Sequence, residues 1–417
     1  MKRHSEVLVP LEAWVYNSPD LLLMNKQIDL GLFSEALLYY DRIIINFGNP
    51  QQFAFFIEWF VVNNLYKELL ELFDNEVLTI YDYAFMTTVI QNEGRYSLWN
   101  IQDPIQELPN TFHRRYLYHE VIEKVLRKSK DRIKLYNTLE NRVIEIKASE
   151  FGSSIENAKH DYFNTRRSAL LLQSIVDEVY PLVGVSKIPT IKTTVTANGD
   201  NITTTYNIPF EEISQLIGNN NNFHPGIPLI GAAHCNRLIW SASKLNCDLF
   251  LGRPMSGIVG DKLLECGNTL SKSIDIIHQL QDEVEFPDIR VLVNSGVLEL
   301  KDILYIRSKA KKFRTWLQEE GERDRNAIIA YHNEISKEVG LIKYGRKTLR
   351  LFGFFGGPIG GAYVGSTVAG PTGAVVGAAA GAGLEYITDI SSKIGEGWRP
   401  VVFGNWLKDR IDGNSKE

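Results

Sequence analysis

The chain has 417 residues, of which 44% are hydrophobic and 23% are charged, a balance typical of folded proteins and not of disordered ones. Its formal net charge of −5 and its pI near 6.0 argue against a surface built as a whole for nucleic acid. A chain of this length has enough apolar residues for two or three cores.

The cysteines and the N-terminal residues indicate in which cellular compartment the chain is expected. Cys235, Cys247 and Cys266 are odd in number and lack C-x-x-C spacing, so neither a disulfide framework nor a zinc knuckle is expected. Pro10 and Glu12 interrupt the apolar run that a signal peptide would need. These features favour a reducing cytoplasm.

The first segment, residues 1–110, is expected to be a mixed α/β domain. Two short runs rich in β-branched residues, 41–46 and 77–81, predict strands. Between them Asn49-Pro50 has the form of a helix start, and a second helical stretch covers 65–73. The first helix carries large apolar side chains on one face, at Phe53, Phe56, Ile57 and Phe60. A strand, a helical crossover and a second strand predict a parallel βαβ-like unit.

The second segment, residues 111–290, is expected to be an α+β domain. Residues 142–147 alternate charged with branched apolar residues, as a half-buried strand does, and one long helix is predicted over 161–179. Two runs that flank Asn198-Gly199-Asp200 predict a β-hairpin at 190–208, because asparagine and glycine tolerate positive φ.

The remaining elements are mostly helical. A helix is predicted over 229–245 and a strand over 247–251. In the third segment, residues 291–417, strand signals disappear, and apolar residues three or four apart predict amphipathic helices over 303–317 and 328–342. The expected fold class is α+β, with mixed α/β N-terminal and middle parts and an all-α C-terminal part.

An uncharged glycine-rich stretch occupies residues 351–384. Glycine costs about 1 kcal/mol relative to alanine within a helix, so this many glycines need a compensating gain. A small residue at every fourth position provides that gain, because it lets two helices approach closely. These small residues are Gly353, Gly357, Gly361, Gly365, Ala369, Gly373, Gly377 and Gly381. The pattern resembles the glycine zippers of membrane-inserting proteins, which implies membrane insertion or tight helix packing for this stretch alone.

Length and proline content predict that residues 351–384 form a helical hairpin. One straight helix would be roughly 51 Å long, well beyond the ~30 Å hydrocarbon core of a bilayer. Pro371 lies near the middle and would divide it into arms of about 15 residues, whereas a spanning helix needs ~20. Three partners stay open for this hairpin: lipid, another copy of the chain, or the interior of a soluble domain.

Basic residues lie on the N-terminal side of the hairpin, at Lys343, Arg346, Lys347 and Arg350. Such a group is expected at a cytoplasmic flank that faces anionic lipid, and it also suits nucleic acid. A separate basic stretch at 307–314 includes Arg307 and Arg314, and it is either a solvated face or a contact for phosphate groups.

One residue pair has the spacing of a known catalytic motif. Glu145 and Lys147 are two apart on a predicted strand, so they face the same way, like the E-x-K pair of restriction-type nucleases. The alternative is an exposed strand face, and the upstream acid that a nuclease needs is not identified by the sequence, since three residues qualify equally: Asp41, Asp82 and Asp131. No metal site or cofactor is expected, because the histidines and glycines lack the spacing of zinc, phosphate-loop or dinucleotide motifs.

These features favour a non-enzymatic cytoplasmic sensor or effector protein. Its α/β part would bind a protein partner or other signal, and its hairpin would associate with the inner face of a membrane, peripherally or integrally, or with itself. Bacterial toxins and phage-defence effectors have such an arrangement, which is an analogy of architecture only. One alternative is a soluble enzyme acting on nucleic acid, with the hairpin as a structural or oligomerisation element. Another is a scaffold protein that self-associates through the hairpin.

Overall fold

The structure is a computed structural model of the chain and falls into two compact units. It describes residues 6–23, 26–47, 50–83, 86–92, 95–101, 117–146, 154–198, 201–217, 223–265 and 289–309, with residues 311 and 314. The first unit comprises residues 1–33 and 41–259, and the second comprises 34–40 and 260–417. The glycine-rich stretch at 351–384, its basic flank, the helix predicted over 328–342 and Lys147 lie outside the described residues.

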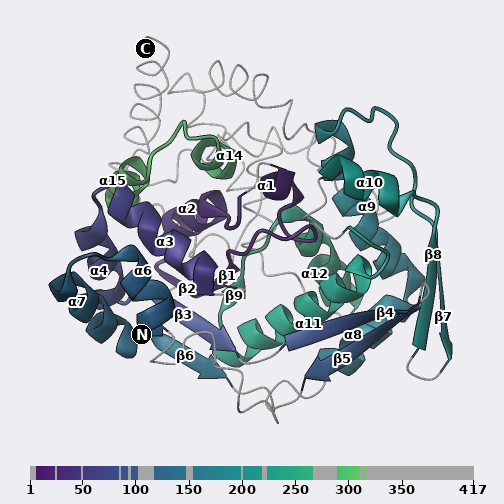
Figure 1. Cartoon of the computed structure of the whole chain (residues 1–417), viewed down its shortest axis with the longest axis horizontal. Coiled ribbons are helices and arrows are strands. Elements are labelled where there is room, and N and C mark those ends of the chain that lie inside the picture. Colours follow the sequence, from purple (N-terminus) through teal and green to yellow (C-terminus); the bar gives the residue numbers. More distant parts are fainter. Residues whose placement is uncertain are drawn as a thin grey trace, which may run out of the picture. The chain divides into compact units, whose positions relative to one another are not determined.

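A five-stranded parallel sheet forms the centre of the first unit, and its strand order is β6-β3-β2-β1-β9 (Figure 1). The strands are β1 (Glu6–Pro10), β2 (Arg42–Asn46), β3 (Leu78–Tyr83), β6 (Val143–Ile146) and β9 (Asp248–Leu249). The parallel pairing of β2 with β3 confirms the predicted βαβ unit. The sheet takes strands from both of the first two segments expected from the sequence, so those segments share one core.

The central strands are apolar on both faces because helices cover the sheet on both sides. Val7, Leu8 and Val9 of β1 are fully buried, and so are their neighbours in β2 to within 1%. Figure 1 shows α3 (Pro50–Val62) and α4 (Tyr66–Asp74) on one side and α11 (Ile227–Leu245) on the other. Continuous apolar runs of this kind are typical of parallel sheets. The predicted face of α3 is confirmed, since its residues Phe53, Phe56, Ile57 and Phe60 have no exposed area.

A second, antiparallel sheet has the strand order β4-β5-β8-β7. Its strands are β4 (Met86–Asn92), β5 (Arg95–Ile101), β7 (Thr193–Asn198) and β8 (Asn201–Tyr206). The predicted hairpin is confirmed, because Asn198 pairs with Asn201 across a two-residue connection. β4 and β5 were not predicted from the sequence. Together the two sheets and the helices confirm the mixed character of the expected fold class.

The helix predicted as one rod over 161–179 is two helices, and that prediction was wrong in this respect. α8 (Ser154–Phe163) ends and α9 (Thr165–Leu182) begins on either side of Asn164, whose side chain accepts a hydrogen bond from the Arg167 amide at 3.4 Å. Asparagine at this position is a favoured N-cap, so it starts a new helix. The break brings Arg167 onto Asp161, with 2.7 Å between Nη1 and Oδ1, and Asn236 of α11 donates to the second carboxylate oxygen at 2.6 Å.

In the second unit, α14 (Ile289–Asn294) and α15 (Leu300–Lys309) are described together with the end of α2 (Leu30–Tyr39). Arg307 of α15 is buried and donates hydrogen bonds to the main-chain oxygens of Leu37 and Tyr40. It therefore satisfies carbonyls at the end of α2. Arg314 is likewise buried, so neither arginine belongs to the solvated or phosphate-binding face suggested by the sequence.

The other described elements complete the chain. They are α1 (Pro19–Leu23), the π-helix η1 (Leu117–Ile122), α6 (Glu123–Val125), α7 (Ser129–Glu140), α10 (Phe210–Ile217) and α12 (Arg253–Glu265). In the described part of the chain, no helix is both long enough and apolar enough to cross a bilayer.

The buried Asp161–Arg167 pair gives a prediction for stability. Replacing Asp161 by Ala leaves the Arg167 guanidinium buried without its carboxylate, which should lower the free energy of unfolding by about 3–5 kcal/mol in urea titrations. The matched control is Lys301→Ala, which removes an exposed ion pair with Glu299 and should change stability by less than about 1 kcal/mol. Equal losses of unfolding free energy in the two variants would show that the Asp161–Arg167 pair at the α8–α9 break contributes no more than an exposed ion pair.

Candidate functional site

The strand order places a candidate site at the carboxyl ends of β1 and β9. From β1 the chain builds the sheet outward through β2, β3 and β6, and it then returns to the other side of β1 for β9. In open α/β sheets, ligands bind outside the carboxyl ends of the strands where the order reverses in this way. The loop that leaves β1 at this point carries Glu12, which is only 2% exposed.

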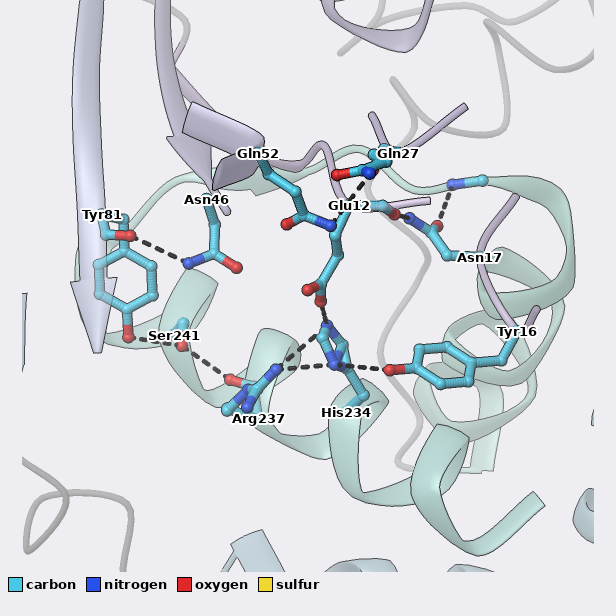
Figure 2. A network of polar contacts seen from close by, with 11 residues as sticks. Glu12, Tyr16, Asn17, Gln27, Asn46, Gln52, Tyr81, His234, Arg237 and Ser241 are labelled. Carbon is cyan, nitrogen blue, oxygen red and sulfur yellow. Dashed lines mark hydrogen bonds and ion pairs between the residues drawn. The ribbon is translucent and has the colours of Figure 1, made fainter. Parts of the chain in front are cut away.

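The Glu12 carboxylate contacts His234 of α11, which in turn contacts Arg237 of the same helix. Nε2 of His234 is 2.6 Å from Oε1 of Glu12, a short contact that lacks the geometry of a regular hydrogen bond. Arg237, one helical turn further along α11, places Nη2 at 2.7 Å from Nδ1 and 3.2 Å from Nε2 of His234. Figure 2 shows the three side chains converging, with the Tyr16 hydroxyl 3.4 Å from Nδ1. We call Glu12, Tyr16, His234 and Arg237 the Glu12 cluster.

Burial sets the protonation states in the Glu12 cluster. Burial, and next the positive charge of Arg237, hold the pKa of His234 well below its usual range, so the imidazole is neutral. An arginine can only donate, so a ring nitrogen of His234 accepts from Arg237. Burial also raises the pKa of Glu12, although the charge of Arg237 and a hydrogen bond from the Trp14 side chain oppose that shift.

A second row of polar side chains connects the Glu12 cluster to β2 and β3. Asn46, at the end of β2, donates to the main-chain oxygen of Tyr81 at 3.0 Å. The Tyr81 hydroxyl lies 2.8 Å from Oγ of Ser241, which donates to the main-chain oxygen of Arg237 at 2.8 Å. In Figure 2 the amide groups of Asn46 and Gln52 point toward the same region as the Glu12 carboxylate.

Among the described side chains, the unused hydrogen-bonding capacity around the Glu12 cluster includes an acceptor, Oδ1 of Asn46, and a donor, Nε of Arg237. Asn46 is 1% exposed, and its Oδ1 has no hydrogen-bond partner among the described residues. A buried carbonyl without a donor is unfavourable by about 1–3 kcal/mol, so such groups usually meet ordered water or a ligand. The arrangement therefore suits a small polar molecule that offers an N–H or O–H donor to Asn46 and an acceptor to Arg237.

Other chemistries have less support in the described residues. No three histidine, cysteine, aspartate or glutamate side chains in the described ranges come together as metal ligands. Burial raises the pKa of Cys247 to about 12, which keeps this thiol protonated and unreactive. A cavity lined by Asp161, Arg167 and Ser168 has a volume of about 10 Å³, enough for one water molecule.

The residues singled out by the sequence are only partly placed. Glu145 lies on the edge strand β6, where its register partner on β3 is Asp82, one of the three candidate acids. Lys147 follows directly but lies outside the described ranges, as do the eight small residues from Gly353 to Gly381 and the basic residues from Lys343 to Arg350. Asp131 lies on α7 and Asp41 precedes β2, so neither neighbours Glu145 in the sheet.

Sequence reasoning missed every member of the Glu12 cluster. One signal was present in α11, where His234, Arg237 and Ser241 are three and four residues apart on a helix of mostly small and apolar residues. That spacing puts them on one face. The other signal was Glu12 itself, an acid just after an apolar run, which was interpreted only as evidence against a signal peptide and not as the end of a strand.

The neutral state of His234 predicts a sensitivity of stability to acid. The unfolded chain binds a proton on this residue near the usual pKa of 6.5, whereas the folded chain does not, so folding weakens as the pH falls below that value. His234→Gln should reduce the loss of unfolding free energy between pH 7 and pH 5.5 by about 1 kcal/mol. Glu12 has the opposite dependence, but it is present in both proteins and largely cancels in the difference.

Urea titrations at both pH values measure this effect, and His160→Gln, which removes an exposed histidine, is the matched control. An identical pH dependence in the wild type and in His234→Gln would show that His234 is not held neutral by burial.

Comparison of the chain with protein-family models, with curated proteins and with solved structures gives no significant match. The chemistry of the site is therefore what bears on function.

Proposed function

We propose that this chain is a non-enzymatic sensor and effector protein of the cytoplasm. Its first unit recognises a small polar molecule or a polar group of a protein partner at the Glu12 cluster, and residues 351–384 respond by associating with the inner face of a membrane or with another copy. The observation that carries the proposal is the buried, incompletely hydrogen-bonded cluster at the point where the order of the parallel strands reverses.

The physical chemistry of the cluster supports recognition rather than mere packing. A carboxylate, an imidazole and a guanidinium are each more than nine-tenths buried here, and apolar side chains of the same volume would pack at least as favourably. The Oδ1 atom of Asn46 faces the same region without a donor. Buried polar groups that are not fully satisfied are more often found at binding sites than in structural cores.

The pattern of small residues supports the output part of the proposal. Eight of them recur at intervals of four from Gly353 to Gly381, a spacing that allows close approach of helices in lipid or in a protein core. The basic residues from Lys343 to Arg350 precede them, as expected where a segment meets anionic headgroups. Toxins and defence effectors of bacteria combine sensing and membrane parts in this way, and that likeness is one of architecture.

Deleting residues 351–384 tests the output. The full chain should pellet with liposomes that contain anionic lipid and resist alkaline extraction, and the deletion should stay in the supernatant while keeping the circular dichroism of the first unit. Loss of oligomers alone, measured by light scattering without liposomes, would point to the scaffold function instead. Unchanged pelleting and unchanged mass would contradict both.

Point variants separate helix packing from general hydrophobicity. Gly361→Leu combined with Gly365→Leu adds apolar surface but blocks close approach, so it should weaken membrane or self-association. Val364→Leu, between them, adds bulk at a position that is already large and should leave association unchanged. Stronger association of the double variant would show that hydrophobicity, not packing, drives it.

A second candidate function is hydrolysis of nucleic acid, and one observation favours it. The register partner of Glu145 is Asp82, so of the three candidate acids Asp82 is the one on the strand next to Glu145. Adjacent parallel strands are about 4.8 Å apart, so the backbones of these two positions are neighbours. Lys147, two residues after Glu145, would then act near the phosphate.

Lys147→Ala and Asp82→Asn test this candidate in assays with Mg²⁺ and labelled single-stranded and double-stranded DNA and RNA. Each variant should abolish cleavage by the purified chain, whereas Lys134→Ala on α7 should leave it intact. Absence of cleavage by the wild type, or cleavage that survives both variants, would eliminate the nuclease function.

A further inference from the structure

The loop that carries Glu12 is hydrogen-bonded next to the starts of α2 and α12, the two helices in which the chain passes from the first unit to the second. The chain passes from the first unit to the second inside α2, between Phe33 and Ser34, and again inside α12, between Val259 and Gly260. Both helices begin in the first unit, directly beside the loop formed by residues 11–18. A change in this loop therefore has two covalent routes into the second unit.

Asn17 fastens the loop to the start of α12. Its Nδ2 donates to the main-chain oxygen of Glu12 at 2.9 Å, and its Oδ1 accepts from the amide of Gly252 at 3.2 Å. Gly252 immediately precedes α12. A Cβ atom at this position would lie 2.0 Å from the main-chain oxygen of Asn17, so only glycine permits the contact. We call these two hydrogen bonds the Asn17 clamp.

Asp29 fastens the same loop to the start of α2. Its amide donates to the main-chain oxygen of Leu11 at 2.8 Å, and its carboxylate accepts from Oγ of Ser18 at 3.0 Å. The other carboxylate oxygen accepts from the amide of Leu32 at 2.9 Å, so Asp29 is the N-cap of α2. Ser18 and Asp29 have no exposed area, which holds this attachment in one geometry.

Glu12 joins these attachments to the candidate site. Its carboxylate contacts His234, its main-chain oxygen is held by Asn17, and the residue before it is held by Asp29. We infer that the 11–18 loop is a coupling element: a change in the contacts of Glu12 alters the stability of α12 through the Asn17 clamp and of α2 through Asp29. This inference rests on the proposed sensor function and names how the site is connected to the rest of the chain.

Amide hydrogen exchange of the full chain measures this coupling without any ligand or membrane. Glu12→Gln keeps the size of the side chain but removes its charge, so it perturbs the site. We expect it to change the amide exchange rates of residues 260–265 in α12 and of residues 34–39 in α2 by about threefold or more. This factor corresponds to the lower end of the interaction free energies found between contacting residues.

Gly252→Ala breaks the Asn17 clamp, so a double-mutant cycle identifies the route. In the Gly252→Ala background, Glu12→Gln should no longer affect residues 260–265, while its effect on residues 34–39 should persist through Asp29. Ser18→Ala should weaken the second effect and leave the first. The matched control is Gly257→Ala, within α12, where a Cβ atom meets Oγ of Ser174 at an ordinary 3.9 Å and the effect of Glu12→Gln should remain.

The cycle has outcomes that overturn the inference. Unchanged exchange of both helices in Glu12→Gln, or an equal change of α12 with and without the clamp, would show that the loop transmits nothing. Asn17→Ala removes both hydrogen bonds without adding a methyl group, and it takes the place of Gly252→Ala if that variant does not fold. Because exchange is measured without liposomes, failure of the coupling and failure of membrane or self-association are seen in separate experiments.

Discussion

The burial of the Glu12 carboxylate is the constraint on which the arrangement of the first unit depends. Removing a carboxylate from water is unfavourable by several kcal/mol unless a counter-charge and donors accompany it. Glu12 follows β1, which lies between β2 and β9 in the sheet, and its contact His234 comes from α11, more than 200 residues later in the chain. The helix must therefore lie across the carboxyl ends of the strands for the carboxylate to be tolerated there.

This requirement explains why the polar contacts continue from α11 toward β3. With Arg237 fixed by His234, Ser241 is one turn further along and reaches the Tyr81 hydroxyl. Asn46 then donates to the main-chain oxygen of Tyr81, which is also its register partner. Each bond satisfies a group that burial would otherwise leave unpaired, so the row of contacts fixes the rotation of α11 about its own axis.

The local parts of the fold were predictable from the sequence, whereas long-range pairings were not. The strands at 41–46 and 77–81, the start of α3 at Pro50 and the hairpin at Asn198 depend on neighbours within a few residues. The strand predicted over 247–251 is present as the two-residue strand β9, whereas β1 was not predicted. Their place in the sheet depends on the pairing of β1 with β9, which is far away in the sequence. Local strand propensity does not predict such a pairing.

The candidate site was unpredictable for the same reason. Glu12 and His234 acquire their chemical meaning only when β1, β9 and α11 meet, and each residue alone resembles an ordinary surface acid or a core histidine. The spacing of His234, Arg237 and Ser241 was visible, but an amphipathic helix face of that kind is usually solvated. By contrast, Glu145 and Lys147 could be singled out from the sequence because they are only two residues apart. What the structure adds is that Asp82 is the register partner of Glu145.

The charges of the Glu12 cluster also restrict what it can recognise. A neutral His234 leaves Arg237 as the positive partner of the Glu12 carboxylate, since an imidazole without a second proton adds no charge. An anionic ligand would compete with Glu12 for Arg237 and leave a buried carboxylate unpaired, which is strongly unfavourable. A neutral ligand with donors instead meets Oδ1 of Asn46 and leaves the existing pairing intact. For the proposed recognition, an uncharged molecule that donates to Oδ1 of Asn46 and accepts from Nε of Arg237 would therefore suit the cluster better than a phosphate.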